Sequence, residues 1–205
     1  MHRKSELEVD KLSEAGQVSH VESRNAPGPG WARWRAPLGY PVAALCLWLA
    51  RPTFVSILIG SVVAVFGLLI RGAAAGHLRK REALAHTGLY ARTRNPLYFG
   101  SALIAAGFVL ASRSWIVAAL LGLYFVIFYA QVMRREESEL RQQYGRVFDD
   151  YAASVPLFWP RLRSKVSARD TQFSFAQYIR NREYHAAIGA ALLIAVLLAL
   201  ATWRR

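Results

Sequence analysis

The chain has few of the residues that crosslink small domains or hold metal ions. Its 205 residues include one cysteine, Cys46, which excludes an intramolecular disulfide. Neither a Ser–His–Asp nor a Cys–His arrangement is evident, and no glycine-rich phosphate loop follows a strand. The five histidines lack the spacing of metal ligands; they are His2, His20, His77, His86 and His185. We therefore expect neither a hydrolase nor a metal site.

Acidic residues are also scarce, with 13 Asp and Glu against 26 Lys and Arg, and the formal net charge is +13. Such a charge is compatible with nucleic-acid binding, but the cations lie between apolar runs rather than on one basic face. Anionic lipid headgroups explain them better. Hydrophobic residues make up 54% of the chain and the mean hydropathy is +0.20. This composition is typical of a membrane protein, not of a nucleic-acid partner.

Five apolar runs define the expected fold, over residues 36–50, 53–70, 96–111, 115–133 and 186–203. A membrane-spanning helix needs about 20 residues, with a range of about 17–25, and the second, fourth and fifth runs fit this length. The first and third runs are short, but a very short link joins each to the next run. We predict an all-α integral membrane protein with about five transmembrane helices arranged as helical hairpins.

Small residues recur within two of these runs. Gly60 and Gly67 lie seven residues apart, as do Gly100 and Gly107. Each pair therefore occupies one face of its helix and permits a close approach of a neighbouring helix.

The polar segments divide the chain into three expected regions. Residues 1–30 are polar and carry no apolar stretch of the kind found in signal peptides, so we expect a disordered tail. Residues 31–165 contain four of the helices and form the expected core. Residues 166–205 form an amphipathic linker and the last transmembrane helix.

Charge predicts the orientation. With a cytoplasmic N-terminus, all but four of the 26 Lys and Arg residues lie on the cytoplasmic side. The exceptions are Arg51, Arg113, Arg204 and Arg205. This bias predicts an inner-membrane protein with its two long polar segments in the cytoplasm.

The first polar segment ends in GLYARTRNPLYFG, residues 88–100. Asn95 is a favourable N-cap and Pro96 a favourable first helical residue. Arg94 therefore lies at a helix N-terminus, where free N–H groups and the helix dipole favour an anion.

The second polar segment reads RREESELRQQYGRVFDDY over residues 134–151. Its apolar stripe, Leu140, Tyr144, Phe148 and Tyr151, predicts an amphipathic helix along the membrane interface, unless Gly145 breaks it in two. Glu137 points with this stripe and needs a partner there, either an arginine or a ligand. The alternative is a solvated Glu136–Glu137 pair at the mouth of the fourth helix.

These groups suit a zwitterionic cofactor. Arginine binds a carboxylate, glutamate accepts from ribose hydroxyls or an ammonium group, and tyrosine faces favour a sulfonium cation. S-adenosylmethionine carries all of these groups. Methyl transfer from it depends mainly on positioning and desolvation.

Residues 88–100 also resemble the G-x-Y-x-x-x-R-[HN]-P-x-Y-x-G signature of the isoprenylcysteine carboxyl methyltransferase family, which is related to the membrane phospholipid methyltransferases. A second signature follows at Glu136, Glu137, Leu140, Tyr144, Gly145, Phe148, Tyr151, Val155 and Pro156. The resemblance covers residues 38–160, including RGAAAGHLRK from Arg71. It implies an S-adenosylmethionine-dependent methyltransferase acting on a lipophilic acceptor, with cytoplasmic amphipathic helices forming the cofactor pocket.

By this resemblance, the cofactor-binding residues are His77, Tyr90, Arg94, Pro96, Tyr98, Glu136 and Glu137, and Arg94 and Glu137 are the expected catalytic residues. For His77 the alternative is an interfacial residue hydrogen-bonded to a helix end. For Tyr90 and Tyr98 it is packing in an aromatic belt.

The chain departs from the family in two places. Eukaryotic members that methylate prenylated cysteine usually have histidine where this chain has Asn95, so the resemblance does not extend to that substrate. The apolar run at 186–203 follows the second motif. Two other functions stay open: an NADPH-dependent sterol- or enone-type reductase, and a non-enzymatic lipid-binding protein. The oligomeric state is also open.

Overall fold

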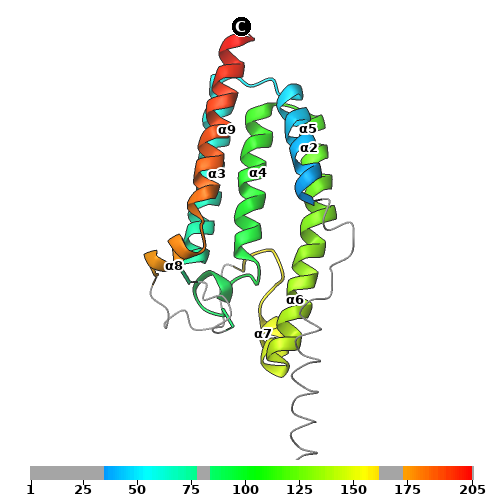
Figure 1. Ribbon diagram of the computed structural model, residues 1–205, viewed down its shortest axis with the longest axis vertical. Coiled ribbons are helices and arrows are strands. Elements are labelled where there is room, and N and C mark those ends of the chain that lie inside the picture. Colours follow the sequence, from blue (N-terminus) through cyan, green and yellow to red (C-terminus); the bar gives the residue numbers. More distant parts are fainter. Residues whose placement is uncertain (1–34, 78–83, 162–172, 205) are drawn as a thin grey trace, which may run out of the picture. The chain divides into compact units, whose positions relative to one another are not determined.

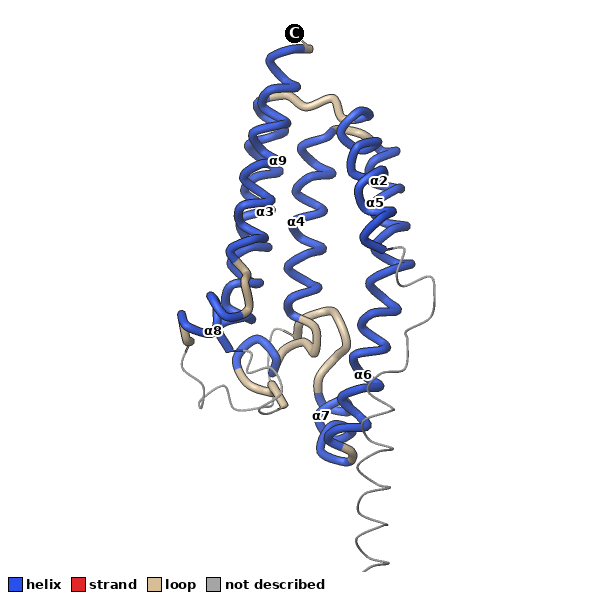
Figure 2. The backbone as a smooth tube through the Cα atoms, viewed as in Figure 1, coloured by secondary structure: helices blue, strands red, loops and turns tan. Residues whose placement is uncertain are grey.

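In the computed structural model, residues 35–77, 84–161 and 173–204 are described, and every regular element among them is helical (Figure 1, Figure 2). The prediction of an all-α membrane protein is confirmed. The chain divides into two units, residues 1–41 and 42–205, and the described part of the first is the start of one helix. The tail predicted at 1–30 and the linker residues 166–172 lie outside the described residues.

The helical elements follow the predicted runs closely. In chain order they are α2 (Arg35–Leu49), α3 (Phe54–His77), the 3-10 turn η2 (Gly88–Ala91), α4 (Pro96–Ser112), α5 (Trp115–Tyr124), the π-helical turn η3 (Phe125–Tyr129), α6 (Ala130–Tyr144), α7 (Arg146–Ser154), α8 (Phe175–Arg180) and α9 (Tyr184–Trp203). The elements α5, η3 and α6 form one continuous helix of 30 residues.

Three described helices are long and apolar enough to cross a membrane: α3, the continuous helix Trp115–Tyr144, and α9. These correspond to the second, fourth and fifth runs, as predicted. The first and third runs form shorter apolar helices, Pro37–Leu49 and Pro96–Ser112. One boundary differs, because α3 continues seven residues beyond the predicted end at Ile70 and reaches His77. The sequence from Gly72 to Gly76 is small and helix-compatible, and Arg71 finds partners within the protein.

Helices α3 and α4 pack together along facing glycines, although the predicted hairpins had placed them in different pairs. A Cβ atom on Gly67 would lie 2.6 Å from the Gly100 carbonyl oxygen, and one on Gly100 would lie 2.7 Å from that of Gly67. Gly60 and Gly107 face each other in the same way, seven residues along each helix from the first pair. The predicted close approach is confirmed, and the pairing shows that the two helices run antiparallel.

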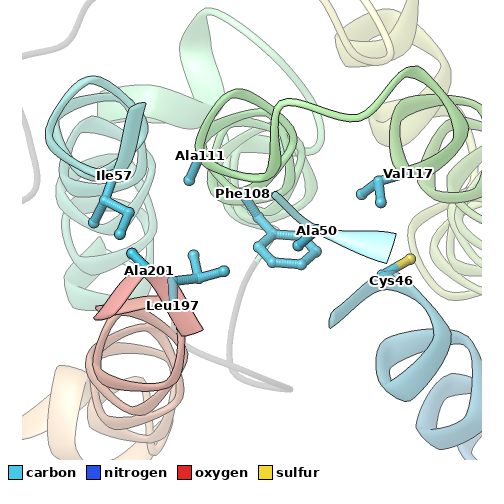
Figure 3. Packing of buried hydrophobic residues seen from close by; sticks show 8 residues of the cluster. All are labelled: Cys46, Ala50, Ile57, Phe108, Ala111, Val117, Leu197 and Ala201. Carbon is cyan, nitrogen blue, oxygen red and sulfur yellow. The ribbon is translucent and has the colours of Figure 1, made fainter. Parts of the chain in front are cut away.

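A buried cluster joins α3 and α4 to α2, α5 and α9 (Figure 3). Phe108 of α4 lies at its centre, with Ile57 of α3 and Leu197 of α9 on one side and Val117 of α5 on the other. Cys46 is a fully buried member, as expected for a small residue in an apolar helix. The cluster holds the helices together at the end remote from the two polar motifs.

Backbone contacts tie this same end. The Arg51 amide donates to the Ser112 carbonyl at 2.8 Å, and the Ser56 hydroxyl donates to the Ala111 carbonyl at 2.9 Å. Arg204, after α9, donates to the Ala50 carbonyl and to the Trp48 carbonyl. Since α9 ends here, its N-terminus lies with the C-terminus of α3, at the end where the polar segments gather (Figure 1).

Candidate functional site

Backbone hydrogen bonds connect the segment before α4 to the segment that follows α7. The Arg94 amide donates to the Pro156 carbonyl at 2.9 Å, and the Arg161 amide donates to the Arg92 carbonyl at 3.0 Å. Asn95 occupies the N-cap position of α4, but its side chain makes no capping hydrogen bond; its amide instead donates to the Leu157 carbonyl at 3.0 Å. The predicted N-cap position of Asn95 is thus confirmed, but its side chain bonds the Leu157 carbonyl and does not cap the helix.

Two tyrosines make a second connection between the motifs. The Tyr151 hydroxyl of α7 donates to the Tyr90 carbonyl of η2 at 2.7 Å, and both residues are buried. Burial raises the pKa of both phenols, Tyr90 and Tyr151, above their ordinary value. Both side chains are therefore neutral at physiological pH, and the Tyr151 proton is retained for this hydrogen bond.

The predicted apolar stripe is present, but it runs over two helices. Gly145 has a φ of 54°, a value that favours glycine, and it separates α6 from α7. The alternative in which Gly145 breaks the helix is thus the observed one. Phe148 and Tyr151 of α7 still pack with Leu140 and Tyr144 of α6. The bend folds α7 back, so that the apolar side chains of α6 and α7 pack against each other.

Glu137 lies on the inner side of α6, where it pairs with Arg94. The two side chains are only 19% and 16% exposed, so the pair is largely withdrawn from solvent. The Nε atom of Arg94 is also buried and has no hydrogen-bond partner within the described residues. A buried unpaired N–H is costly unless a further acceptor reaches it. The Arg94 Nε–H is thus a buried donor for which the described residues supply no acceptor.

Glu136, the neighbouring acid, accepts a hydrogen bond of 2.6 Å from the Tyr98 hydroxyl. The Tyr98 ring meets the Tyr129 ring of η3 edge to face, with centroids 5.5 Å apart. The π-helical turn therefore lies directly beside the start of α4. Irregular helical turns of this kind frequently occur at functional sites.

These side chains surround a cavity of about 480 Å³, here called the polar cavity. Its volume falls within the range of about 300–1,000 Å³ typical of small-molecule sites. Six of the seven predicted cofactor-binding residues line it: Tyr90, Arg94, Pro96, Tyr98, Glu136 and Glu137.

The seventh predicted residue, His77, does not line the polar cavity. Its Nδ1 atom lies 2.7 Å from the Ala73 carbonyl oxygen, and its ring packs edge-on against Phe173. The ring also lies beside Gly88, whose φ of 60° favours glycine. This placement matches the alternative interpretation, a histidine bonded to a helix end.

The sequence analysis did not assign several of the lining residues to the cofactor site, including Arg71, Leu84, Asn95, Leu97, Glu139 and Gln143. Of these residues, only Arg71 could have been recognised from the sequence, because a cation at the end of an otherwise apolar run needs a partner. Its guanidinium donates to the Glu183 carboxylate, the Ser101 hydroxyl and the Leu97 carbonyl. Glu183 precedes α9, far along the chain, so no local pattern predicted the pairing.

A second cavity, of about 460 Å³, lies among the membrane helices and is here called the apolar cavity. Its lining comes mainly from α2, α4, α5 and α9 and is mostly apolar, including Leu47, Ile104, Phe108 and Leu193. Arg71 is the residue that lines both cavities. The two cavities are therefore neighbours, with Arg71 between them. Among the described residues, no group of three His, Cys, Asp or Glu side chains could hold a metal ion.

Comparisons with known proteins agree with this architecture. Residues 45–147 match the family model described as phospholipid methyltransferase. Over 84 residues the chain is 38% identical to the nickel-cobalt-cadmium resistance protein NccN of Alcaligenes xylosoxydans xylosoxydans. That alignment covers 41% of this chain and 39% of NccN. No solved structure matches. The matched family residues contain α3, both motif helices α4 and α6, and the Arg94–Glu137 pair, so the chain belongs to the phospholipid methyltransferase family.

Proposed function

We propose that this protein transfers a methyl group from S-adenosylmethionine to the polar head of a lipophilic acceptor, at the cytoplasmic face of the inner membrane. The observation that carries the proposal is Arg94, which is paired with Glu137 in the polar cavity and whose buried Nε–H finds no partner in the described part of the chain. The family supports the reaction class and the lipid-like acceptor.

The polar cavity fits the groups of this cofactor. The Nε–H donor of Arg94 suits a carboxylate, and the Glu136 and Glu137 carboxylates suit an ammonium group and ribose hydroxyls. The rings of Tyr90 and Tyr98, with Pro96, provide apolar and π surface for the remainder. We assign these six residues to cofactor binding. We assign His77 a structural role, because its ring packs beside the turn at Gly88 and does not line the polar cavity.

When bound, the cofactor supplies an electrophilic methyl group on a sulfonium sulfur. The chain's contribution is to orient the partners and exclude water. Phe148 and Tyr151 of α7 and Leu140 of α6 close one wall of the polar cavity with apolar surface. Arg94, fixed by Glu137, orients either the cofactor or the acceptor, and these two residues are the ones we assign to catalysis.

The acceptor's apolar part would occupy the apolar cavity. That cavity is lined by membrane helices, so a lipid can reach it without crossing water. Since Arg71 lies between the two cavities, an acceptor with its tail among α2, α4, α5 and α9 has its head beside the polar cavity.

The orientation follows from charge. Both motif segments lie at one end of α4 and α6, and the cation-poor links, including Arg51 and Arg113, lie at the other. The excess of Lys and Arg favours the cytoplasm for the motif end.

Titration of the purified protein with three cofactors tests the proposal. Calorimetry should show saturable binding of S-adenosylmethionine and S-adenosylhomocysteine and none of NADPH. Binding of NADPH alone would favour the reductase, and binding of none of the three would favour a lipid-binding protein. A membrane lipid extract incubated with methyl-labelled S-adenosylmethionine should then yield a labelled lipid.

A further inference from the structure

Arg71 has almost no hydrogen-bonding capacity left for a ligand. Its Nε and Nη2 atoms donate to the two oxygens of Glu183, at 3.0 Å and 2.9 Å. Its Nη1 atom donates to the Leu97 carbonyl and the Ser101 hydroxyl. A guanidinium has five N–H donors, so four of the five are engaged. Arg94 differs, because no described residue accepts a hydrogen bond from its Nε–H.

Glu183 makes this pairing from outside the region shared with the family model, which ends at residue 147. It immediately precedes α9, the helix that follows the second motif. Its side chain is 9% exposed and that of Arg71 is 21% exposed. The bidentate pair therefore neutralises the cation at the junction of the two cavities in a partly desolvated setting, where charges interact strongly.

The charges around the junction favour particular head groups. The polar cavity is lined by two arginines, Arg71 and Arg94, and by three glutamates, Glu136, Glu137 and Glu139. Glu183 adds a fourth carboxylate behind Arg71. An anionic head arriving at Arg71 would meet engaged donors and a nearby carboxylate, and like charges at short range disfavour binding.

We propose that Glu183 is a specificity-determining residue that prevents acceptors with a carboxylate head from binding at Arg71, so that the acceptor site takes uncharged or cationic heads. This inference rests on the proposed function, because it assumes that an acceptor's head reaches the cavity junction. It assigns a role to the segment between α8 and α9: this segment supplies the counter-charge that sets the head-group preference.

Two single-chain amphiphiles with the same tail test the inference: N-tetradecanoylglycine, which carries a carboxylate, and N-tetradecanoylethanolamine, which carries a hydroxyl. Equilibrium binding of each radiolabelled compound is measured on the purified full chain in detergent, with protein-free micelles as the blank. The wild-type protein should bind the ethanolamide at least tenfold more tightly than the glycine conjugate.

Glu183→Gln keeps the shape of the side chain and removes its charge. It should strengthen binding of the glycine conjugate at least tenfold and leave ethanolamide binding within about twofold. The Arg71→Gln/Glu183→Gln double variant should lose that gain, because the freed cation is gone. Asp149→Asn, which removes a charge from an exposed ion pair with Arg141 on α6 and α7, should leave both affinities unchanged.

The inference is overturned if the wild type binds the glycine conjugate as tightly as the ethanolamide, if it binds neither, or if Glu183→Gln leaves the ratio unchanged. If Glu183→Gln does not fold, the inference is judged on the wild-type protein alone, by whether it binds the ethanolamide at least tenfold more tightly than the glycine conjugate. The binding measurements contain no S-adenosylmethionine and are therefore independent of methyl transfer. If the protein shows the expected head-group preference but transfers no methyl group in a separate assay, the proposed reaction is refuted and the inference about Glu183 stands.

Discussion

The guanidinium of Arg94 is ion-paired with Glu137, 43 residues later in the chain. The pair joins the two motifs, one before α4 and one on α6, inside the polar cavity. It also explains why a carboxylate lies on the inner side of an amphipathic helix. Among the described residues the Arg94 Nε–H has no acceptor, and this is why we propose the pair as a ligand-binding point.

Arg94→Lys should retain the fold and lose most methyl transfer. A lysine keeps the charge near Glu137 but cannot reproduce the planar fork or offer the second, Nε donor. A displacement of about 1 Å at a reacting centre can cost roughly 100-fold in rate, and we expect a loss of that order. Labelled-methyl transfer to lipid extract measures it. Weakened S-adenosylhomocysteine binding would assign Arg94 to the cofactor, and unchanged binding to the acceptor, which we slightly favour. Wild-type turnover by the variant would contradict both roles.

Glu137→Ala should weaken S-adenosylmethionine binding. Removing a buried, hydrogen-bonded carboxylate typically costs about 1–3 kcal/mol. This corresponds to roughly a 5- to 150-fold change in dissociation constant, which calorimetry resolves. Asp150→Ala, at an exposed carboxylate on α7, is the matched control and should bind normally. Equal affinities in the two variants, with the fold intact, would remove Glu137 from the site.

Gly67→Ala should destabilise the α3–α4 pair. The added Cβ would lie 2.6 Å from the Gly100 carbonyl oxygen and 2.9 Å from the Ile104 amide nitrogen, neither of which can move freely. Overpacking of this kind costs about 1–3 kcal/mol. Gly122→Ala meets no atom within 4 Å and should be neutral or stabilising by up to about 1 kcal/mol. Thermal unfolding in detergent compares the two, and equal midpoints would exclude tight glycine packing.

Tyr151→Phe should lower the free energy of unfolding by about 1–3 kcal/mol, because the buried Tyr90 carbonyl loses its donor. The wild type should also lose stability in alkali. Burial raises the folded-state pKa of Tyr151 above its unfolded value of about 10, so this contribution is complete below pH 10 and falls as the pH rises above it. The variant should show a smaller alkaline loss. Tyr144→Phe, whose hydroxyl accepts only an exposed hydrogen bond from Gln143 among the interactions described, should behave as wild type.

Reporters fused to the two termini should lie on opposite sides of the membrane, the N-terminal one in the cytoplasm and the C-terminal one outside. The cation bias sets the orientation, and five crossings place the ends apart. A reporter after Arg205 that is active in the cytoplasm would show an even number of crossings. One of the short apolar helices, α2 or α4, would then be the segment that does not span.

Much of this protein follows from local sequence patterns. Apolar run lengths identified the helices that cross the membrane, because the bilayer imposes its thickness on each segment separately. The seven-residue spacing of the glycines alone predicted a close helix contact, which forms between Gly60, Gly67, Gly100 and Gly107. Motif residues such as Tyr90 and Glu137, which line the polar cavity, could be predicted as candidate site residues because their types and order are readable without any fold.

Tertiary structure decided the partners. Nothing local distinguishes Glu183 from any other helix-terminal acid, yet it neutralises Arg71 and allows α3 to continue to His77. Asn95 occupies the N-cap position that its local sequence predicts, but its side-chain amide donates to the Leu157 carbonyl, a contact that no local pattern indicates. In each case a polar group leaves water and must be satisfied by whatever the fold brings near. That partner lies dozens of residues away, where neither periodicity nor propensity reaches, so only the packed helices could determine it.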